Sequence, residues 1–431
     1  MISQIVFIII LAAAVYLFSK NAGKIRRNIL LGKDTVRNDQ RALRWKTMAK
    51  VALGQTKMVK RPLAAVMHFF IYIGFIIINL EVMEIMIDGV FGTHRVFSGM
   101  GSLYDLLIGG FEVLAVLVLV ACVVFLARRN VAHLKRFSGV EMTEWPRSDA
   151  NYILCIEIIL MTAFLTMNAA DYKLQALHFE HYIKAGSFPV SAMIAPLLPD
   201  GASTLAVIER VCWWLHIVGI LAFLNYLPYS KHFHILLAFP NTWYSNLNPK
   251  GQFTNMNSVT NEVKAMLDPT FVPENSGEVG RFGAKDVTDL TWKNLMEAYT
   301  CTECGRCTSV CPANITGKLL SPRKIMMDTR DRITEVGANI DKHGADFKDD
   351  KTLLDNYITR EELWACTSCN ACTDACPVNI NPLEIITELR RYAVMEESQA
   401  PASINAMFGN MENNGAPWKY SNADRFNWAA E

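Results

Sequence analysis

Two short cysteine clusters are the residues of this sequence whose types and spacing most plainly imply chemistry. They read Cys301-Thr-Glu-Cys304-Gly-Arg-Cys307-Thr-Ser-Val-Cys311-Pro312 and Cys366-Thr-Ser-Cys369-Asn-Ala-Cys372-Thr-Asp-Ala-Cys376-Pro377. Both fit the spacing C-x2-C-x2-C-x3-C-P, in which three thiolates bind one [4Fe–4S] cluster and the fourth binds the other cluster. The spacing therefore predicts two clusters that share ligands crosswise: Cys301, Cys304, Cys307 and Cys376 for the first cluster, and Cys366, Cys369, Cys372 and Cys311 for the second.

The competing interpretation of the cysteines is a pair of structural zinc sites, because four thiolates can also bind zinc. Zinc ribbons pair two distant C-x2-C knuckles, whereas here four cysteines fall within eleven residues that end in Cys-Pro, and they do so twice. The pattern therefore favours iron–sulfur clusters. Clustered cysteines in a chain without a cleavable secretory signal also argue against a disulfide framework.

Histidines in or beside apolar segments form a second candidate group, since haem b in a helical bundle takes two axial imidazoles from facing helices. If the helix that holds His216 continues past Pro228, then His216 and His234 share a face about 27 Å apart and His232 points away from it. His68 and His234 then lie at a similar depth in the membrane, near its cytoplasmic side. This predicts one haem b with these two ligands.

A second haem stays open from the sequence. His216 would need a partner from the other half of the bundle, and His94, in a loop, is the only reachable histidine. The expected haem ligands are thus His68, His216 and His234, with His94 and His232 less favoured. The alternative for each histidine is a satisfied core residue.

Five apolar segments must position these groups: 2–18, 63–88, 104–127, 151–168 and 205–227. A helix needs about 20 apolar residues to cross a bilayer, and soluble core helices rarely run this long without a polar stripe. No basic residue precedes the first segment, while Lys20 and Lys24 follow it. This order predicts a retained anchor and not a signal peptide.

The loops between these segments differ sharply in charge. Loop 19–62 holds thirteen Lys and Arg and loop 128–150 holds five, whereas loop 89–103 holds only Arg95 and loop 169–204 only Lys173 and Lys184. Basic loops stay in the cytoplasm. We therefore expect a multi-pass protein of the bacterial cytoplasmic membrane, with its N-terminus outside and the cysteine motifs in the cytoplasm.

Acidic residues inside the apolar segments are the third candidate group: Glu81, Glu84, Asp88, Glu112 and Glu157. Charges at this depth cost several kcal/mol unless they are paired or hydrated. One interpretation is proton transfer at a quinone site. The other is burial against Arg210 and similar partners, or snorkelling to the interface.

The chain is thus expected to be mainly α, with a transmembrane domain over 1–240, a connector over 241–295, a domain with two [4Fe–4S] clusters over 296–395, and an extended tail over 396–431 that binds a partner. The net charge of +1 argues neither for nor against nucleic acid. No nucleic-acid partner is expected.

Two segments after the motifs, Gly317-Lys-Leu-Leu-Ser-Pro-Arg323 and Asn381-Pro-Leu-Glu-Ile-Ile-Thr-Glu-Leu-Arg390, carry a family resemblance. Residues 295–395 resemble the ferredoxin-like, iron–sulfur half of the heterodisulfide reductase and anaerobic glycerol-3-phosphate dehydrogenase family. In many of its members a half with Cys-Cys-Gly motifs follows, but no cysteine follows Cys376 here, and the tail resembles the linker to that half. The resemblance implies a separate Cys-Cys-Gly partner subunit, with a flavoprotein also considered as electron donor.

Residues 1–240 resemble the gamma subunit of respiratory nitrate reductase, which implies a b-type cytochrome, although the second helix offers one histidine where that family has two. Together the two resemblances imply an electron-transport subunit of a quinone oxidoreductase complex. Electrons would pass between menaquinone or another quinone, haem b, the two clusters and the partner. The alternatives are a membrane anchor without haem or quinone chemistry, and a redox sensor of the quinone pool.

Overall fold

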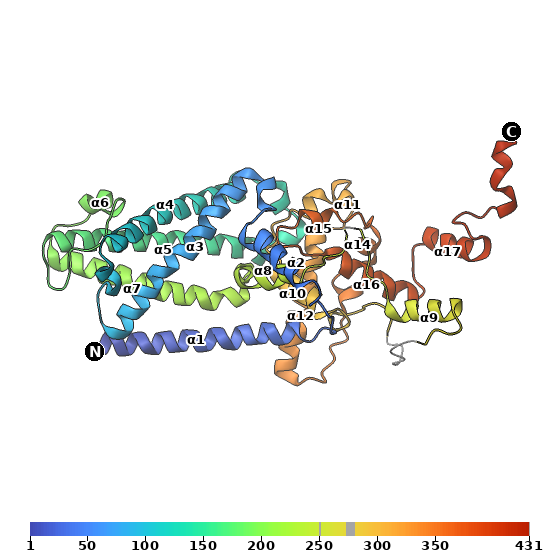
Figure 1. Ribbon diagram of the computed structural model, residues 1–431, viewed down its shortest axis with the longest axis horizontal. Helices are drawn as coiled ribbons and strands as arrows, with labels where there is room; N and C mark the ends of the chain where they lie inside the picture. The colour runs from blue at the N-terminus through green and yellow to red at the C-terminus, as the bar shows by residue number, and fades with distance from the viewer. Residues whose placement is uncertain (250, 273–280, 431) are drawn as a thin grey trace. The chain divides into compact units, whose positions relative to one another are not determined.

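The computed structural model describes residues 1–249, 251–272 and 281–430, and these are mainly α-helical, as predicted (Figure 1). The chain divides into two compact units. Unit 1 comprises Met1–Arg27, Trp45–Thr242 and Thr302–Gly305, and unit 2 comprises Asn28–Arg44, Trp243–Cys301 and Arg306–Glu431. Parts of the predicted connector (250 and 273–280) and of the tail (431) lie outside the described residues.

Five helices of unit 1 have the length and apolar composition to cross a membrane, which confirms the five predicted spans. They are α1 (Ile2–Ile29), α3 (Pro62–Phe91), α4 (Ser102–Asn130), α5 (Trp145–Ala176) and α7 (Ala202–Tyr226). Each helix extends beyond at least one end of its predicted segment, because hydropathy marks only the apolar middle while the polar ends stay helical. The short helices α2 (Arg41–Met48), α6 (Ser191–Ile194) and α8 (His234–Trp243) lie in or next to the connections between them.

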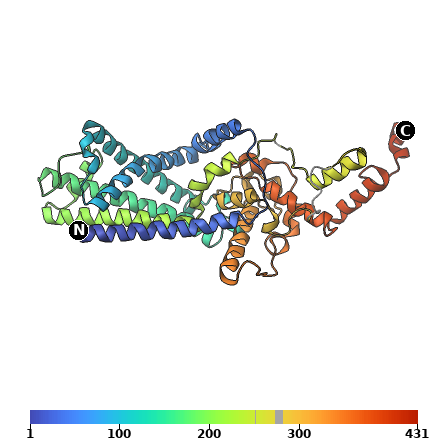
Figure 2. The same ribbon diagram turned by 60° about the horizontal axis from the view of Figure 1, so that its bottom comes forward.

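Helix α5 is the centre of the bundle. Its most apolar stretch is 61% buried, against 11% for α1, because α5 packs against both α4 and α7. Helix α1 lies along α7, where the ring of Phe7 is 5.6 Å from that of Trp213 and Asn225 donates a hydrogen bond to the Ala14 carbonyl at 3.1 Å (Figure 2). The bundle therefore buries its polar residues between α3, α4, α5 and α7.

The fifth spanning helix breaks before the last histidines. Helix α7 ends at Tyr226, and two single 3-10 turns, Leu227–Tyr229 and Lys231–Phe233, precede α8. Ser230 between them is extended, with φ −118° and ψ 150°, and its hydroxyl accepts a hydrogen bond from the backbone N–H of His232. The expectation that His216 and His234 share one continuous helix face is therefore wrong.

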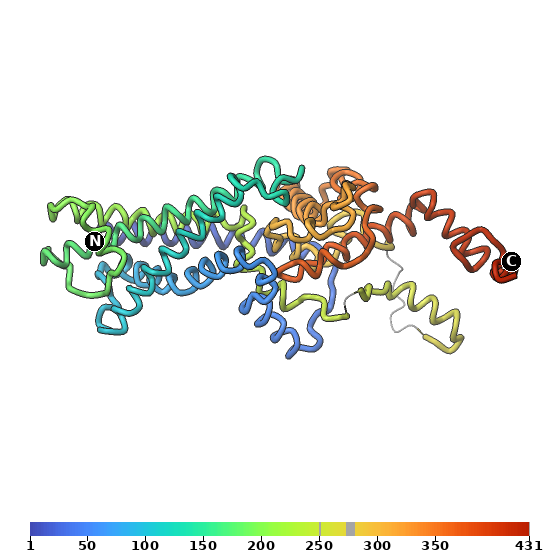
Figure 3. Tube along the Cα trace, turned by 90° about the horizontal axis from the view of Figure 1, so that it is seen from above, coloured from blue at the N-terminus to red at the C-terminus, as the bar shows by residue number. Residues whose placement is uncertain are grey.

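Unit 2 is built from shorter helices around the cysteine motifs: α9 (Asn257–Leu267), α10 (Trp292–Thr300), α11 (Pro312–Ile315), α12 (Pro322–His343), α13 (Leu353–Asn356), α14 (Arg360–Trp364), α15 (Ala371–Ala375), α16 (Pro382–Met395) and α17 (Ala402–Asn414). Within the described ranges the β-pairing consists of two isolated bridges, Lys33 with Thr291 and Leu354 with Ile358. The predicted extended tail is helical in α17, and Figure 3 traces the chain from α16 into this helix.

The segment Asn28–Arg44, expected as part of a membrane loop, belongs to unit 2. Lys33 donates its backbone N–H to the Leu290 carbonyl at 2.8 Å, and its own carbonyl accepts the N–H of Trp292 at 3.0 Å. The guanidinium of Arg37 forms an ion pair with Glu384 of α16 at 2.9 Å. This N-terminal segment therefore closes one side of unit 2.

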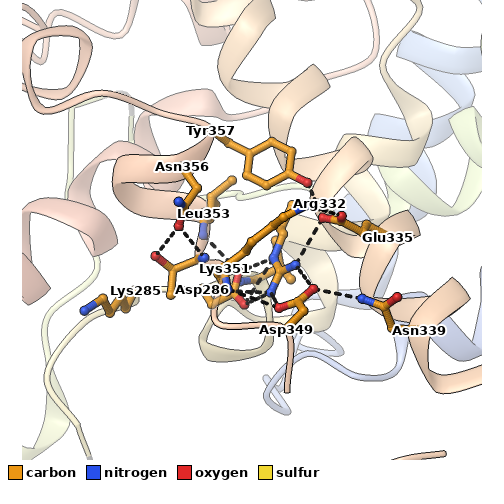
Figure 4. A network of polar contacts seen from close by, with 12 residues as sticks. Lys285, Asp286, Arg332, Glu335, Asn339, Asp349, Lys351, Leu353, Asn356 and Tyr357 are labelled. Atoms are coloured by element: carbon orange, nitrogen blue, oxygen red, sulfur yellow. Dashed lines mark hydrogen bonds and ion pairs between the residues drawn. The ribbon is translucent and has the colours of Figure 1, made fainter. Parts of the chain in front are cut away.

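Arg332 of α12 organises the chain between the two motifs (Figure 4). Its side chain is only 3% exposed and forms ion pairs with Asp286 at 2.7 Å and Asp349 at 2.6 Å, and it also donates to the Lys351 carbonyl at 2.6 Å. Burial of a guanidinium is tolerated because each of its nitrogens finds an acceptor. The network fixes residues 349–353 against α12.

Candidate redox sites

The two motif loops have positive φ angles at the same two positions. Glu303 (φ 54°) and Gly305 (φ 69°) in the first loop correspond to Ser368 (φ 57°) and Asn370 (φ 59°) in the second. A left-handed residue on either side of the second cysteine turns the chain tightly, and glycine and asparagine tolerate this conformation best. Both loops can therefore wrap three thiols around one corner of a cluster.

The structure brings Cys311 of the first motif to the cysteines of the second. The thiols of Cys366 and Cys372 both lie close enough to Cys311 to interact electrostatically, and Cys366 also lies close to Cys369. Burial raises the pKa of the Cys372 thiol to about 12, so an apo thiol here is protonated and a bound metal would be needed to hold the thiolate. This is the arrangement that crosswise ligation requires.

The chemistry of the eight motif cysteines fits iron–sulfur clusters, since none of the eight is in a disulfide among the described residues. Backbone N–H groups point at two of the sulfurs, from Ser368 to Cys366 Sγ at 3.4 Å and from Ile380 to Cys376 Sγ at 3.3 Å. Such bonds stabilise a thiolate and tune a cluster. Cys369 is the one exposed member of the eight.

The first motif differs in how its loop is held. Its residues Thr302–Gly305, with Cys304, are grouped with unit 1. Within unit 1, the buried carboxylate of Glu303 accepts a hydrogen bond from the ammonium of Lys231, which also lies 3.8 Å from Asp149. The side chain of Lys231 is 8% exposed, so this cation is shared between two buried carboxylates.

Three histidines gather at one end of the bundle. His232 lies close enough to both His68 of α3 and His234 of α8 to interact electrostatically, and its ring is 5.5 Å from that of His234. It also packs 5.3 Å from the ring of Phe223. The expectation that His232 points away from the other histidines is therefore wrong, for the helix break places it among them. Burial lowers the pKa of His232 to about 3, with the neighbouring His234 and His68 lowering it further.

The three histidines expected as main haem ligands share one feature. In each, Nδ1 is hydrogen-bonded to an oxygen: Gln55 Oε1 at 3.1 Å for His68, the Leu160 carbonyl at 3.0 Å for His216, and the Lys231 carbonyl at 3.1 Å for His234. A ligating histidine usually donates its other N–H in this way, which leaves Nε2 as the basic nitrogen. No sequence pattern marks these anchoring bonds, because Gln55 and Leu160 are distant in the chain from the histidines they hold.

His216 and His94 do not meet. His216 is 1% exposed between the Leu160 carbonyl and the ring of Phe164, and among the described residues it contacts no other histidine. His94 lies instead beside Asp171, with Nε2 3.7 Å from its carboxylate, and packs against the rings of His181 and Tyr182. The pair considered for a second haem is thus not assembled in this structure.

Arg95 is the centre of the buried charges at the end of the bundle that carries loop 92–101. Its guanidinium donates to Asp171 at 2.5 Å, to Asn168 at 2.9 Å and to the Tyr104 hydroxyl at 3.1 Å. The carboxylates of Glu84 and Asp88 accept backbone N–H groups of the loop, from Phe97 at 2.8 Å and from Arg95 itself at 2.7 Å. Most of the predicted acidic cluster therefore has a structural role.

The remaining acidic residues are held in other ways. Glu112 of α4 accepts the backbone N–H groups of Val190 and Ser191 at 2.9 and 3.1 Å. Arg210 pairs with Glu209, an acidic residue not among the predicted site residues although it stands in an apolar segment. Glu157 lies apart from this cluster, partly buried on α5 and close to Cys122.

A cavity of about 340 Å³ opens among these charges. Its lining includes Glu81, His94, Arg95, Asp171, Arg210, Trp213 and Trp214. Two of its polar atoms, Oε2 of Glu81 and Nδ1 of His94, are buried without a hydrogen-bond partner among the described residues, and Glu81 is only 3% exposed. A buried polar atom of this kind can be satisfied by a bound ligand or an ordered water. This cavity, hereafter the polar cavity, is a candidate binding site.

Comparison with known proteins supports the iron–sulfur assignment. A family model described as a 4Fe-4S dicluster domain matches residues 300–380. The chain is 28% identical to the probable iron-sulfur-binding oxidoreductase FadF of Bacillus subtilis, over 100% of this chain and 61% of that protein. It is 26% identical to the EtfAB:quinone oxidoreductase of Syntrophomonas wolfei, over 93% of this chain and 56% of that protein.

A further match covers a smaller share of the chain. A probable membrane-anchored ferredoxin of Chromohalobacter salexigens is 30% identical over 35% of this chain and 24% of that protein. The chain spans 61% and 56% of the length of the two longer relatives. No solved structure matches. The chain is therefore a membrane-anchored iron–sulfur protein of the electron-transfer class, with two [4Fe–4S] clusters bound through its dicluster cysteine motifs.

Proposed function

We propose that the chain is the membrane redox subunit of a quinone oxidoreductase, which passes electrons between a quinone and a cytoplasmic partner through haem b and the two clusters. The observation that carries this proposal is the dicluster domain at 300–380 in one chain with five helices able to span a membrane and a group of histidines held by hydrogen bonds at Nδ1. The name of the Syntrophomonas relative, a quinone oxidoreductase, agrees with this function.

His68 and His234 are the proposed axial ligands of one haem b. Each has its Nδ1 hydrogen-bonded to an oxygen and its Nε2 left basic, and they come from α3 and α8 of the same unit. A haem held there supplies one-electron chemistry, while the protein sets ligation and excludes water. His232 lies beside them and has no such bond at Nδ1 within the part of the chain that the structure describes, so it is assigned as a packing residue. His216 is held in the same way as a ligand but has no histidine opposite it, which supports a single haem.

The polar cavity is the proposed site of the quinone head group. Oxidation of a quinol releases two electrons and two protons, so the site needs two bases as well as an electron acceptor. Oε2 of Glu81 and Nδ1 of His94 are two such atoms without partners among the described residues. Burial lowers the pKa of His94 to about 4, against a smaller opposing effect of Asp171, so its imidazole is neutral and its Nδ1 can accept a hydrogen bond from a quinol hydroxyl. Trp213 and Trp214 supply the apolar wall that a quinone ring requires.

The soluble partner is proposed to be a Cys-Cys-Gly subunit of the heterodisulfide reductase type, with a flavoprotein as the second candidate. The exposed Cys369 supports exchange with such a partner at the cluster of the second motif, because electron transfer needs a short distance between cofactors. The basic loops 19–62 and 128–150 support a cytoplasmic position for this domain.

The test is a spectroscopic titration of the purified full-length chain with a menaquinol analogue. We expect a reduced haem b band and the electron paramagnetic resonance signals of reduced clusters, both appearing on addition of the quinol. A chain with clusters but no haem band would instead be a membrane anchor. A chain that holds both haem and clusters but does not catalyse turnover of the quinol would be a redox sensor.

A pair of variants tests the polar cavity separately. Glu81→Gln should slow reduction by quinol at least about tenfold while the haem and cluster spectra stay unchanged, because the amide cannot take a proton. Glu157→Gln is the matched control, since Glu157 is an acidic residue of a spanning helix that does not line the cavity. Equal quinol rates in the two variants would remove Glu81 from the proposed site.

A further inference from the structure

Arg390 of α16 contacts the second motif directly. Its guanidinium donates to the carbonyl of the cluster ligand Cys366 at 2.6 Å, to the Leu363 carbonyl at 2.8 Å and to the Ser368 hydroxyl at 3.4 Å. The same group lies 5.0 Å from the ring centre of Trp364. One cation thus holds both ends of the segment that runs from Cys366 to Ser368.

The charge of Arg390 has no carboxylate partner among the described residues. All of its hydrogen-bond acceptors are neutral, whereas the adjacent Arg391 pairs with Glu388 at 2.5 Å. A half-buried guanidinium normally has an anion beside it, because desolvation of an unpaired charge is costly. The candidate anion is the Cys366 thiolate, which interacts electrostatically with Arg390 and whose own carbonyl Arg390 contacts at 2.6 Å. The arrangement is therefore complete only when a negatively charged group occupies the second motif.

The residues at the corresponding positions of the first motif carry different charges. The repeat aligns Ser321-Pro322 with Asn381-Pro382, so Arg330 of α12 is the counterpart of Arg390. Arg330 pairs with the carboxylate of Asp331 at 3.1 Å, which compensates its charge. At the position of Ser368, which accepts from Arg390, the first motif has the acidic Glu303. The two cluster sites therefore share the positive-φ turn around the second cysteine but differ in the charges beside it.

We propose that Arg390 is a positioning residue that raises the reduction potential of the cluster bound by Cys366, Cys369, Cys372 and Cys311. A [4Fe–4S] cluster with four thiolates is already negative, so adding an electron to it costs less when a fixed cation lies beside a ligand in a low-dielectric site. Outer contacts of this kind tune a metal centre without ligating it. The cluster that includes the exposed Cys369 would then have a higher reduction potential than the same cluster without Arg390 beside it. This inference needs the two clusters but neither the haem nor the quinone.

The experiment is a redox titration of the full-length chain, followed by electron paramagnetic resonance, with three variants. Arg390→Gln should make electron acceptance by one cluster about tenfold less favourable, which is 59 mV for a one-electron couple. The other cluster should keep its potential. Arg390→Lys, which keeps the charge, should recover roughly half of the shift or more. Arg391→Gln is the control one residue away and should leave both potentials unchanged.

The affected signal should be the one that a Cys369→Ser variant alters, because Cys369 belongs to the second motif. Iron and sulfide content are measured first in every variant. Unchanged potentials in an Arg390→Gln protein that holds both clusters would overturn the proposal. If Arg390→Gln fails to hold the cluster, Arg390→Lys decides: a potential near that of the wild type supports the charge effect, and a fall of about 59 mV or more with the charge kept contradicts it.

Discussion

The two units satisfy their buried charges by different means. In unit 2, Arg332 is surrounded by carboxylates that are themselves 16–30% exposed, so these carboxylates are accessible to solvent. In unit 1, Arg95 lies among Asp171, Asn168 and Tyr104, which are all 2% exposed or less, so protein groups must supply nearly every partner. A buried polar atom without a partner is therefore more informative in the helix bundle. This is why Oε2 of Glu81 identifies a candidate site there.

The largest effect is expected from a test of whether the two motifs of unit 2 exchange a cluster ligand. Because Cys311 lies beside Cys366 and Cys372, Cys311→Ser should remove the same paramagnetic signal as Cys372→Ser. The matched control is Cys301→Ser, which should remove the other signal. Iron content should fall by about half in each variant, because each loses one of two four-iron clusters. A Cys311→Ser spectrum that matches the Cys301→Ser spectrum would mean that each motif binds its own cluster.

The corresponding test in unit 1 removes a histidine. His68→Ala should abolish the haem b band and leave the iron and sulfide of the clusters unchanged, because the two cofactor types use separate ligands. His232→Ala is the control, since His232 lies in the same group but its Nδ1 is not held by an oxygen. An absorbance spectrum of purified His68→Ala that still shows the band would refute this ligand. Loss of the band in His232→Ala would reassign the partner of His68.

What can be predicted from the sequence follows the same division. The cysteine ligands lie within two stretches of eleven residues, so their spacing alone specifies the chemistry, and the apolar runs specify the five helices. The group formed by His68, His232 and His234 joins two distant segments across a helix break. Pro228 predicts a kink, but the two 3-10 turns and the extended Ser230 depend on tertiary packing. The role of Asn28–Arg44 in unit 2 escapes prediction for the same reason, since no local pattern marks it.

Because the carboxylates around Arg332 are partly exposed, loss of their ion pairs should lower the free energy of unfolding less than loss of fully buried pairs would. Arg332→Ala should lower the free energy of unfolding by about 3 kcal/mol, the low end of the range for stranding buried partners, because Asp286 and Asp349 can regain water. The control is Lys351→Ala, whose side chain is 50% exposed in its pair with Glu335 and which should cost about 0.5 kcal/mol. The measurement is the urea midpoint for loss of cluster absorbance in the full-length chain. Similar midpoints for the two variants would show that burial of Arg332 adds nothing.

The variant with the smallest expected effect tests whether the segment 28–44 contributes to the stability of unit 2. A Cβ added at Gly32 would lie 2.6 Å from the backbone nitrogen of Trp292 and 2.7 Å from the carbonyl carbon of Thr291, and backbone atoms cannot give way as a flexible side chain can. Gly32→Ala should therefore push the segment off α10, weaken the Lys33 hydrogen bonds and cost about 1–3 kcal/mol.

Gly23→Ala on α1 is the control for this variant, because nothing lies within 4 Å of its Cβ position and alanine favours a helix. If the urea midpoint for cluster loss were the same in Gly32→Ala as in Gly23→Ala, the segment would be only a tether. A lower midpoint, with faster proteolysis within 28–44, would show that the iron–sulfur unit depends on a segment that ends more than 250 residues before Cys301. The stability of the cluster domain would then rest on a part of the chain that also continues from the first spanning helix, so loss of that helix would weaken the clusters as well as the anchor.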